Sequence, residues 1–127
     1  MARVLLLDDQ PLTREVLKVL LAKRGHQVCA ECGSDEVAIR AFNSCAPDLA
    51  ILDVETSGPL GGPGVLKQAR EDGYQGGAIF LSGCSWQKVA DRLAGLTFNA
   101  YLQKPAEIKA ISREIDAAVC SQTSIPD

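Results

Sequence analysis

At 127 residues the chain is long enough for one domain and too short for two, and a domain of this size can bury a core without disulfides. Its composition, with 46% hydrophobic and 23% charged residues, is that of an ordinary globular protein. The net charge of -3 argues against a nucleic-acid-binding surface, and no apolar run approaches the roughly 18 residues of a membrane span. The apolar run Val4–Leu7 is also too short for a signal peptide, so we expect a cytoplasmic protein.

The first third of the chain alternates between strand and helix. Val4–Leu7 is an aliphatic run without polar gaps, as expected for a strand buried on both faces. Pro11 then opens a helix, where its missing N–H costs nothing, and Gly25 ends it. His26–Cys32 reads as a second strand, and Ser34 is typical of the residue that caps a second helix.

The middle of the chain repeats this alternation. Asp48–Asp53 is predicted to be a third strand, central in the sheet because its interior is aliphatic. The Gly/Pro-rich segment Ser57–Gly64 reads as a loop, and Pro63 is expected to start a third helix that continues to Arg70. Ala78–Leu81 is the fourth predicted strand.

The last third completes the pattern. A helical stripe from Trp86 to Leu93, a short strand at Ala100–Leu102 and a helix with apolar residues from Ile108 to Val119 follow one another. Five strands alternating with five helices predict an α/β fold, an open, doubly wound parallel sheet with helices on both faces. We expect one domain over residues 1–121, and a polar tail or the start of a linker over residues 122–127.

The five cysteines are expected to be reduced thiols. Cys29 and Cys32 form a C-x-x-C motif, but residues three apart on a strand point to opposite faces. The motif alone therefore does not indicate a metal or redox site.

Polar residues stand at the carboxyl ends of four of the five predicted strands. They are Asp8 and Asp9 after the first, Asp53 at the end of the third, Ser82 after the fourth and Lys104 after the fifth. In an open parallel sheet these ends share one edge, where ligands bind. The fold is therefore expected to gather the five residues into one site.

The chemistry of these residues is mutually consistent. Three carboxylates in one cleft repel each other, and a divalent cation with oxygen ligands, Mg²⁺, removes that penalty. A carboxylate such as Asp53 can accept a phosphoryl group, whose charge Mg²⁺, the Lys104 ammonium and the Ser82 hydroxyl would stabilise. The same residues taken singly have plainer interpretations, since Ser82 could be a turn residue and Lys104 an ordinary surface lysine.

Four stretches carry a family resemblance: Val4–Pro11, Pro47–Asp53, Ile79–Gly83 and Tyr101–Pro105. Through them the sequence resembles the receiver domain of two-component response regulators over nearly its whole length. The resemblance implies the flavodoxin-like strand order 2-1-3-4-5 and a signalling module that is not an enzyme, beyond its own phosphorylation and dephosphorylation. It also implies a histidine kinase or phosphotransfer protein as partner, and a possible homodimer through the fourth helix, fifth strand and fifth helix.

The resemblance assigns a role to each site residue. It implies that Asp53 is the phosphoacceptor, and that Asp9 and Asp53 ligate Mg²⁺ directly, with Asp8 acting mostly through water. The backbone carbonyl of Glu55 would be a further ligand.

The remaining implied roles concern the switch. Ser82 and Lys104 would each bind a phosphoryl oxygen, Tyr101 would change rotamer with Ser82, and the Lys104–Pro105 bond would be cis. From packing alone, Tyr101 could equally be a core residue.

The sequence departs from the family at the loop after Asp53. Ser57 stands where proline is usual, and the loop is about one residue longer. Thr97 and Phe98 replace the usual Gly-Ala pair before the fifth strand. These changes affect the expected output surface and leave every reactive group in place.

Three other functions share some of these sequence features. Asp53-Val-Glu55-Thr56 loosely resembles the nucleophile motif of haloacid-dehalogenase-type phosphatases, but Glu55 stands where that motif has Asp and the chain is too short for a cap. A flavodoxin-like FMN site is disfavoured because Asp8 and Asp9 would repel a phosphate. A receiver-shaped binding module that works without phosphorylation remains an alternative.

Overall fold

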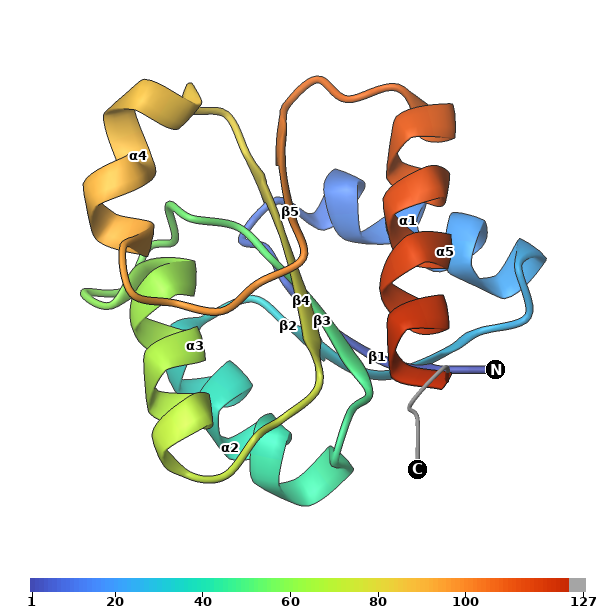
Figure 1. The fold of residues 1–127 in the computed structure, drawn as a ribbon, viewed down its shortest axis with the longest axis horizontal. Helices are drawn as coiled ribbons and strands as arrows, with labels where there is room; N and C mark the ends of the chain where they lie inside the picture. Colours follow the sequence, from blue (N-terminus) through green and yellow to red (C-terminus); the bar gives the residue numbers. More distant parts are fainter. Residues whose placement is uncertain (124–127) are drawn as a thin grey trace.

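A computed structural model describes residues 1–123, in which five strands alternate with five helices (Figure 1). The strands are β1 (Arg3–Leu7), β2 (Gln27–Cys32), β3 (Leu49–Leu52), β4 (Gly77–Ser82) and β5 (Ala100–Gln103). The helices are α1 (Pro11–Lys23), α2 (Asp35–Cys45), α3 (Gly61–Glu71), α4 (Trp86–Leu93) and α5 (Ile108–Thr123). The predicted tail falls partly on α5, and its last residues, 124–127, lie outside the described part of the chain.

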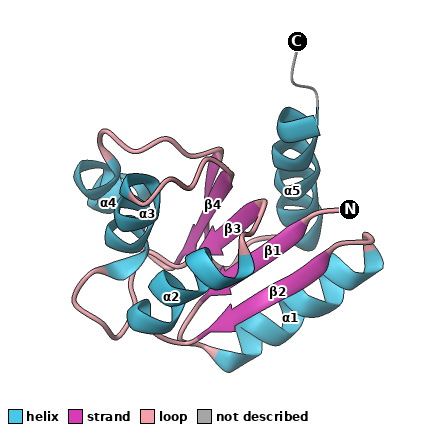
Figure 2. Cartoon of the chain, turned by 90° about the horizontal axis from the view of Figure 1, so that it is seen from below, coloured by secondary structure: helices cyan, strands magenta, loops and turns pink. Residues whose placement is uncertain are grey.

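The strands form one parallel sheet in the order β2-β1-β3-β4-β5. Helices α1 and α5 cover one face, and α2, α3 and α4 cover the other (Figures 1 and 2). This is the doubly wound, flavodoxin-like α/β fold expected from the sequence, and its strand order is confirmed.

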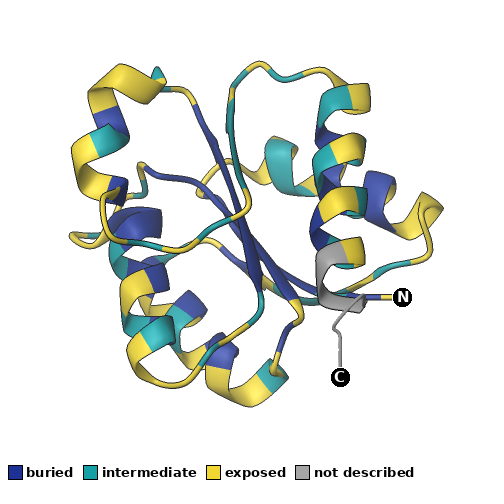
Figure 3. Cartoon of the chain, in the orientation of Figure 1, coloured by how far each residue is buried: buried dark blue, intermediate teal, exposed yellow. Residues whose placement is uncertain are grey.

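The sheet divides the core into two clusters because successive strand residues point to opposite faces. In β1, Leu5 and Leu7 pack toward α2 and α3, whereas Val4 and Leu6 pack toward α1 and α5. Every residue of β3 and β4 is buried, which explains why these strands carry apolar residues on both faces up to Ser82 (Figure 3). Among the described residues, no helix is long and apolar enough to cross a membrane.

The start of α3 differs from the sequence prediction. The helix begins at Gly61, two residues before Pro63, and Gly61 has a φ of +69°, which an L residue rarely adopts. Pro63 still lies within the first turn, where no intrahelical N–H is required. Because glycine disfavours helix, the residues Gly61 and Gly62 did not indicate a helical turn before Pro63.

Candidate functional site

The site lies where the central strands end. Asp8 follows β1, Asp53 follows β3, Ser82 is the last residue of β4 and Lys104 follows β5. The sheet hydrogen bonding continues one step into the site, because Asp53 N donates to Leu7 O at 2.8 Å and Lys104 N donates to Ser82 O at 2.7 Å. The backbones that carry these side chains are therefore held by the sheet itself.

Lys104 bridges two of the acidic residues. Its Nζ donates to Asp8 Oδ2 at 2.7 Å and to Asp53 Oδ2 at 3.3 Å. Both carboxylates are buried, Asp8 being 3% exposed and Asp53 6% exposed. A third donation goes to Gln10 Oε1 at 3.1 Å, so all three ammonium protons have acceptors.

Asp9 completes an acidic triad at the exposed side of the site. One carboxylate oxygen from each of Asp8, Asp9 and Asp53 lies within 4.8 Å of the other two. Three hard oxygen donors at this spacing suit Mg²⁺, which takes few protein carboxylates and keeps its remaining positions for water. The donor set therefore fits the metal expected from the sequence.

Burial dominates the electrostatics of Asp53. It raises the pKa of Asp53; the charge of Lys104 counters this and the charge of Asp8 adds to it. For Lys104, burial disfavours the ammonium, but the hydrogen bond to Asp8 and the charges of both carboxylates outweigh it, so its pKa is raised. Repulsion between the acids thus contributes as expected from the sequence, but burial is the larger cause at Asp53.

The site opens into a cavity of about 400 Å³, lined by Asp9, Gln10, Asp53, Glu55, Gly83, Cys84 and Lys104. Two of these lining residues are bonded to each other, since Cys84 Sγ donates to Glu55 Oε1 at 2.8 Å. This hydrogen bond is the main cause of the raised pKa of the Cys84 thiol. Ser82 is fully buried at the end of β4, and its Oγ accepts from Cys84 N at 3.2 Å.

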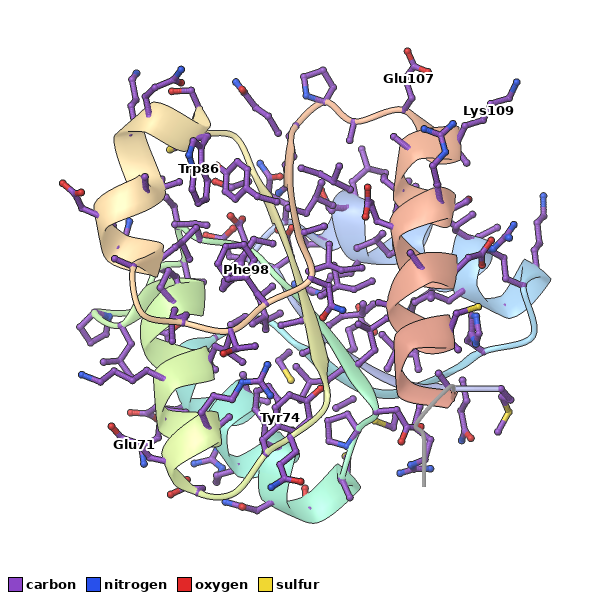
Figure 4. All side chains as sticks on the ribbon, viewed as in Figure 1. Glu71, Tyr74, Trp86, Phe98, Glu107 and Lys109 are labelled. Atoms are coloured by element: carbon purple, nitrogen blue, oxygen red, sulfur yellow. The ribbon has the colours of Figure 1, made fainter. Side chains whose placement is uncertain are left out.

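Tyr101 connects the site to the surface between α4 and β5. Its hydroxyl donates to the carbonyl oxygen of Cys84, and its ring packs edge-on to Trp86 with centroids 5.5 Å apart. Trp86 also contacts Phe98 at 6.2 Å, and both rings lie between α4 and the sheet (Figure 4). Trp86 is 44% exposed, so it is a packing residue with one open face.

The predicted site residues Asp8, Asp9, Asp53, Ser82 and Lys104 are thus brought to one edge of the sheet. The Lys104–Pro105 bond is cis, as the resemblance implied. Sequence reasoning missed Gln10, which accepts from Lys104, and Asp35, which reaches the loop after Asp53. Neither residue was indicated by the sequence, because Gln10 carries no charge and Asp35 lies in the first turn of a helix, where an aspartate ordinarily serves that helix.

Comparison with known proteins identifies the class. Residues 4–116 match the response regulator receiver domain family, so the chain belongs to that family. The acidic residues and Lys104 stand within the matched range, and the triad of Asp8, Asp9 and Asp53 is typical of the receiver metal site.

Individual relatives agree with this class. The chain is 30% identical to protein PilH of Pseudomonas aeruginosa, over 94% of this chain and 98% of PilH. It is 32% identical to the transcriptional regulatory protein TrcR of Mycobacterium tuberculosis over 86% of this chain, but spans only 42% of TrcR. Among solved structures, a receiver domain protein of Clostridium thermocellum, 23% identical, superposes with a TM-score of 0.85 over 97% of this chain and 98% of that one. A LuxR-family response regulator of Aurantimonas, 24% identical, gives 0.86 over 95% of this chain and 86% of that one.

Proposed function

We propose that this receiver domain accepts a phosphoryl group on Asp53, with Mg²⁺ as cofactor, and passes the signal on by a change of conformation. The observation that carries the proposal is the single ammonium of Lys104 bonded to both Asp8 and Asp53. It lies beside a third acid and at the rim of a cavity of about 400 Å³. A structural ion pair has no need of the third carboxylate or of an open cavity.

The chemistry follows from the residues around Asp53. A carboxylate oxygen of Asp53 attacks phosphorus, the phosphorus–nitrogen bond of a phosphohistidine donor breaks, and the imidazole leaves. Lys104 is placed to pair with a phosphoryl oxygen, and the Ser82 hydroxyl can donate to another once it turns from Cys84 N.

Asp9, Asp53, Asp8 through water and the backbone carbonyl of Glu55 would hold the cation. Mg²⁺, when bound, neutralises the charge that gathers on the phosphoryl oxygens. The carboxylates themselves supply the negative field that attracts it.

The switch would involve Ser82 and Tyr101. If Ser82 turns toward the phosphoryl group, the β4–α4 loop moves with it, and this loop carries the Cys84 carbonyl that holds the Tyr101 hydroxyl. The surface of α4, β5 and α5, on which Trp86 packs against Tyr101, would then report the state to an output segment, a partner or a second copy of the chain.

The donor would be a cytoplasmic histidine kinase or phosphotransfer protein. A second cavity, of about 490 Å³, shares Gln10, Gly83 and Lys104 with the site and runs onto α1 beside Leu12 and Val16. Leu12 is 76% exposed and Val16 42% exposed. A protein that brings a phosphohistidine to Asp53 would cover this apolar surface, whereas a small donor would not touch it.

The test is incubation with Mg²⁺ and acetyl phosphate, followed by intact-protein mass measurement. One phosphoryl group should add to the wild type and none to Asp53→Asn, because an amide is not a nucleophile. Glu36→Gln, on the exposed side of α2, is the matched control and should label normally. Labelling that survives in Asp53→Asn would refute the assignment. A wild type that never labels would favour the module that works without phosphorylation.

A further inference from the structure

Asp35 is a buried carboxylate that serves another part of the chain. It is the first residue of α2 and only 3% exposed. The capping oxygen of its own helix comes from Ser34, whose Oγ accepts from Val37 N at 3.4 Å. The Asp35 side chain is therefore free to turn toward the loop between β3 and α3.

Both oxygens of Asp35 bind that loop. Oδ1 accepts from the Thr56 hydroxyl at 2.6 Å, and Oδ2 accepts from Leu60 N at 3.0 Å and from Gly61 N at 3.1 Å. A Cβ on Gly58 would collide with the same carboxylate, so the loop is closely fitted around it. Asp35 thus contacts the loop at its middle and at its end.

The loop needs this carboxylate because α3 has no cap of its own. Leu60 occupies the N-cap position and offers no side-chain acceptor, and the next two residues are glycines. The first N–H groups of a helix have no intrahelical partner, and a negative charge is favourable there. Asp35 supplies both the acceptor and the charge from a different helix.

The loop held in this way begins at the acceptor. Glu55 N donates to Asp53 Oδ1 at 3.1 Å, and Gly62 N closes the loop on Val54 O at 3.2 Å. Thr56, bound by Asp35, follows Glu55 directly in the chain. The orientation of the Glu55 backbone beside Asp53 therefore depends on a hydrogen bond made outside the site.

We infer that Asp35 is a positioning residue for the acceptor loop, residues 54–60, and that it sets Mg²⁺ affinity and phosphoryl acceptance without touching either group. This inference rests on the proposed function of Asp53. A carboxylate suits the task because each of its oxygens accepts, whereas an amide has one accepting oxygen. The Asp35→Asn variant keeps part of the contact and loses the charge, so it should lie between wild type and Asp35→Ala.

The experiment compares Asp35→Ala and Asp35→Asn with two controls. Glu36→Gln removes a negative charge from the same turn of α2 at an exposed residue, and Ile115→Val loosens the core on the opposite face of the sheet. Mg²⁺ affinity is measured by calorimetric titration, and the rate of labelling by acetyl phosphate at saturating Mg²⁺. Amide exchange of Leu60 and Gly61 is followed without Mg²⁺.

In Asp35→Ala the Mg²⁺ dissociation constant should rise roughly tenfold, as when a residue that orients a metal ligand is removed. Labelling should slow, and the amides of Leu60 and Gly61 should exchange faster than in wild type. Asp35→Asn should show smaller changes of the same sign, and both controls should match wild type. Wild-type Mg²⁺ affinity and labelling in Asp35→Ala would overturn the inference, and so would an equal loss of affinity in Ile115→Val.

A second variant decides the matter if Asp35→Ala fails to fold. Thr56→Val removes only the hydroxyl that donates to Asp35 and should weaken Mg²⁺ binding, while Thr56→Ser should restore it. Equal affinity in all three proteins would refute the positioning role. A wild type that binds no Mg²⁺ and takes no label would instead refute the proposed function, while amide exchange at Leu60 and Gly61 would still show whether Asp35 holds the loop.

Discussion

Replacing Lys104 by methionine would remove the charge that joins Asp8 to Asp53 and keep most of the side-chain volume. At an effective dielectric constant near 20, the two contacts at 2.7 and 3.3 Å are each worth about 5 to 6 kcal/mol before desolvation. Much of this is offset by the cost of burying the charges, and removal of one partner from a buried pair typically costs about 3 to 5 kcal/mol. Because the Lys104 side chain keeps 18% of its exposure, we expect the low end, about 3 kcal/mol.

Urea unfolding measures this loss directly. With a slope near 2 kcal/mol per molar, about 3 kcal/mol lowers the midpoint by roughly 1.5 M. Lys109→Met is the matched control, since it removes the same charge from the exposed side of α5 and should leave the midpoint almost unchanged (Figure 4). Mg²⁺ should recover more stability in Lys104→Met than in wild type, because the ammonium no longer competes for the carboxylate oxygens.

The pH dependence gives an independent check. The folded-state pKa of Lys104 is raised, so its contribution is fully present below the ordinary lysine pKa of about 10.4 and is lost as pH rises through the folded-state pKa. At acid pH the contribution fades as Asp53 protonates, at a higher pH than an ordinary aspartate. The stability difference between wild type and Lys104→Met should therefore be widest from neutral pH to about pH 10. Equal midpoints across that window would refute the reasoning.

Three further outcomes are expected. Asp53→Asn should raise the thermal midpoint of the metal-free protein at neutral pH, because burial raises the folded-state pKa of Asp53 and the charged form is therefore unfavourable in the folded protein. The gain in midpoint should vanish below the ordinary aspartate pKa of about 3.9, where the carboxyl is protonated in both states. A gain that persists at acid pH would contradict this cause. Phosphorylated Glu55→Gln should lose its phosphoryl group faster than wild type. The Glu55 charge opposes the negative charge that builds up around the phosphoryl group during attack by water, and Cys84 already engages the carboxylate that could orient that water. Slower decay in a phosphate-release assay would show that Glu55 assists hydrolysis. Phe80→Ala should cost about 3 to 5 kcal/mol in urea unfolding, because Phe80 is fully buried against Phe98, and a loss below about 1 kcal/mol would mean that the core refills the space.

Most of the fold could be predicted because the interiors of the buried strands are uninterrupted apolar runs. Leu49–Leu52 and Gly77–Ser82 have no solvent-facing side, so their sequences show where the middle of the sheet lies. The gathering of Asp8, Asp53 and Lys104 could also be predicted, since the carboxyl ends of parallel strands share one edge.

The orientation of side chains could not be predicted in the same way. An aspartate in the first turn of a helix ordinarily serves that helix, yet Asp35 binds Thr56, which lies 21 residues away. Likewise, the sequence predicts that Lys104 lies near the acidic residues, but it does not predict that Asp8 is closer to the ammonium than Asp53 is. Such choices depend on packing between elements, which local patterns do not record.

The division of the core by the sheet has a consequence for evolution. Substitutions at Phe42, in α2, and at Ile115, in α5, fall in different clusters on opposite faces of the sheet, so their effects on stability should add. Substitutions in the core on one face of the sheet therefore do not require compensating substitutions on the other face. Helices α1 and α5 can diverge to suit a new partner while the helices that support the acceptor loop remain as they are. Such independent drift would let the same backbone persist at the 23% identity seen with the Clostridium thermocellum protein.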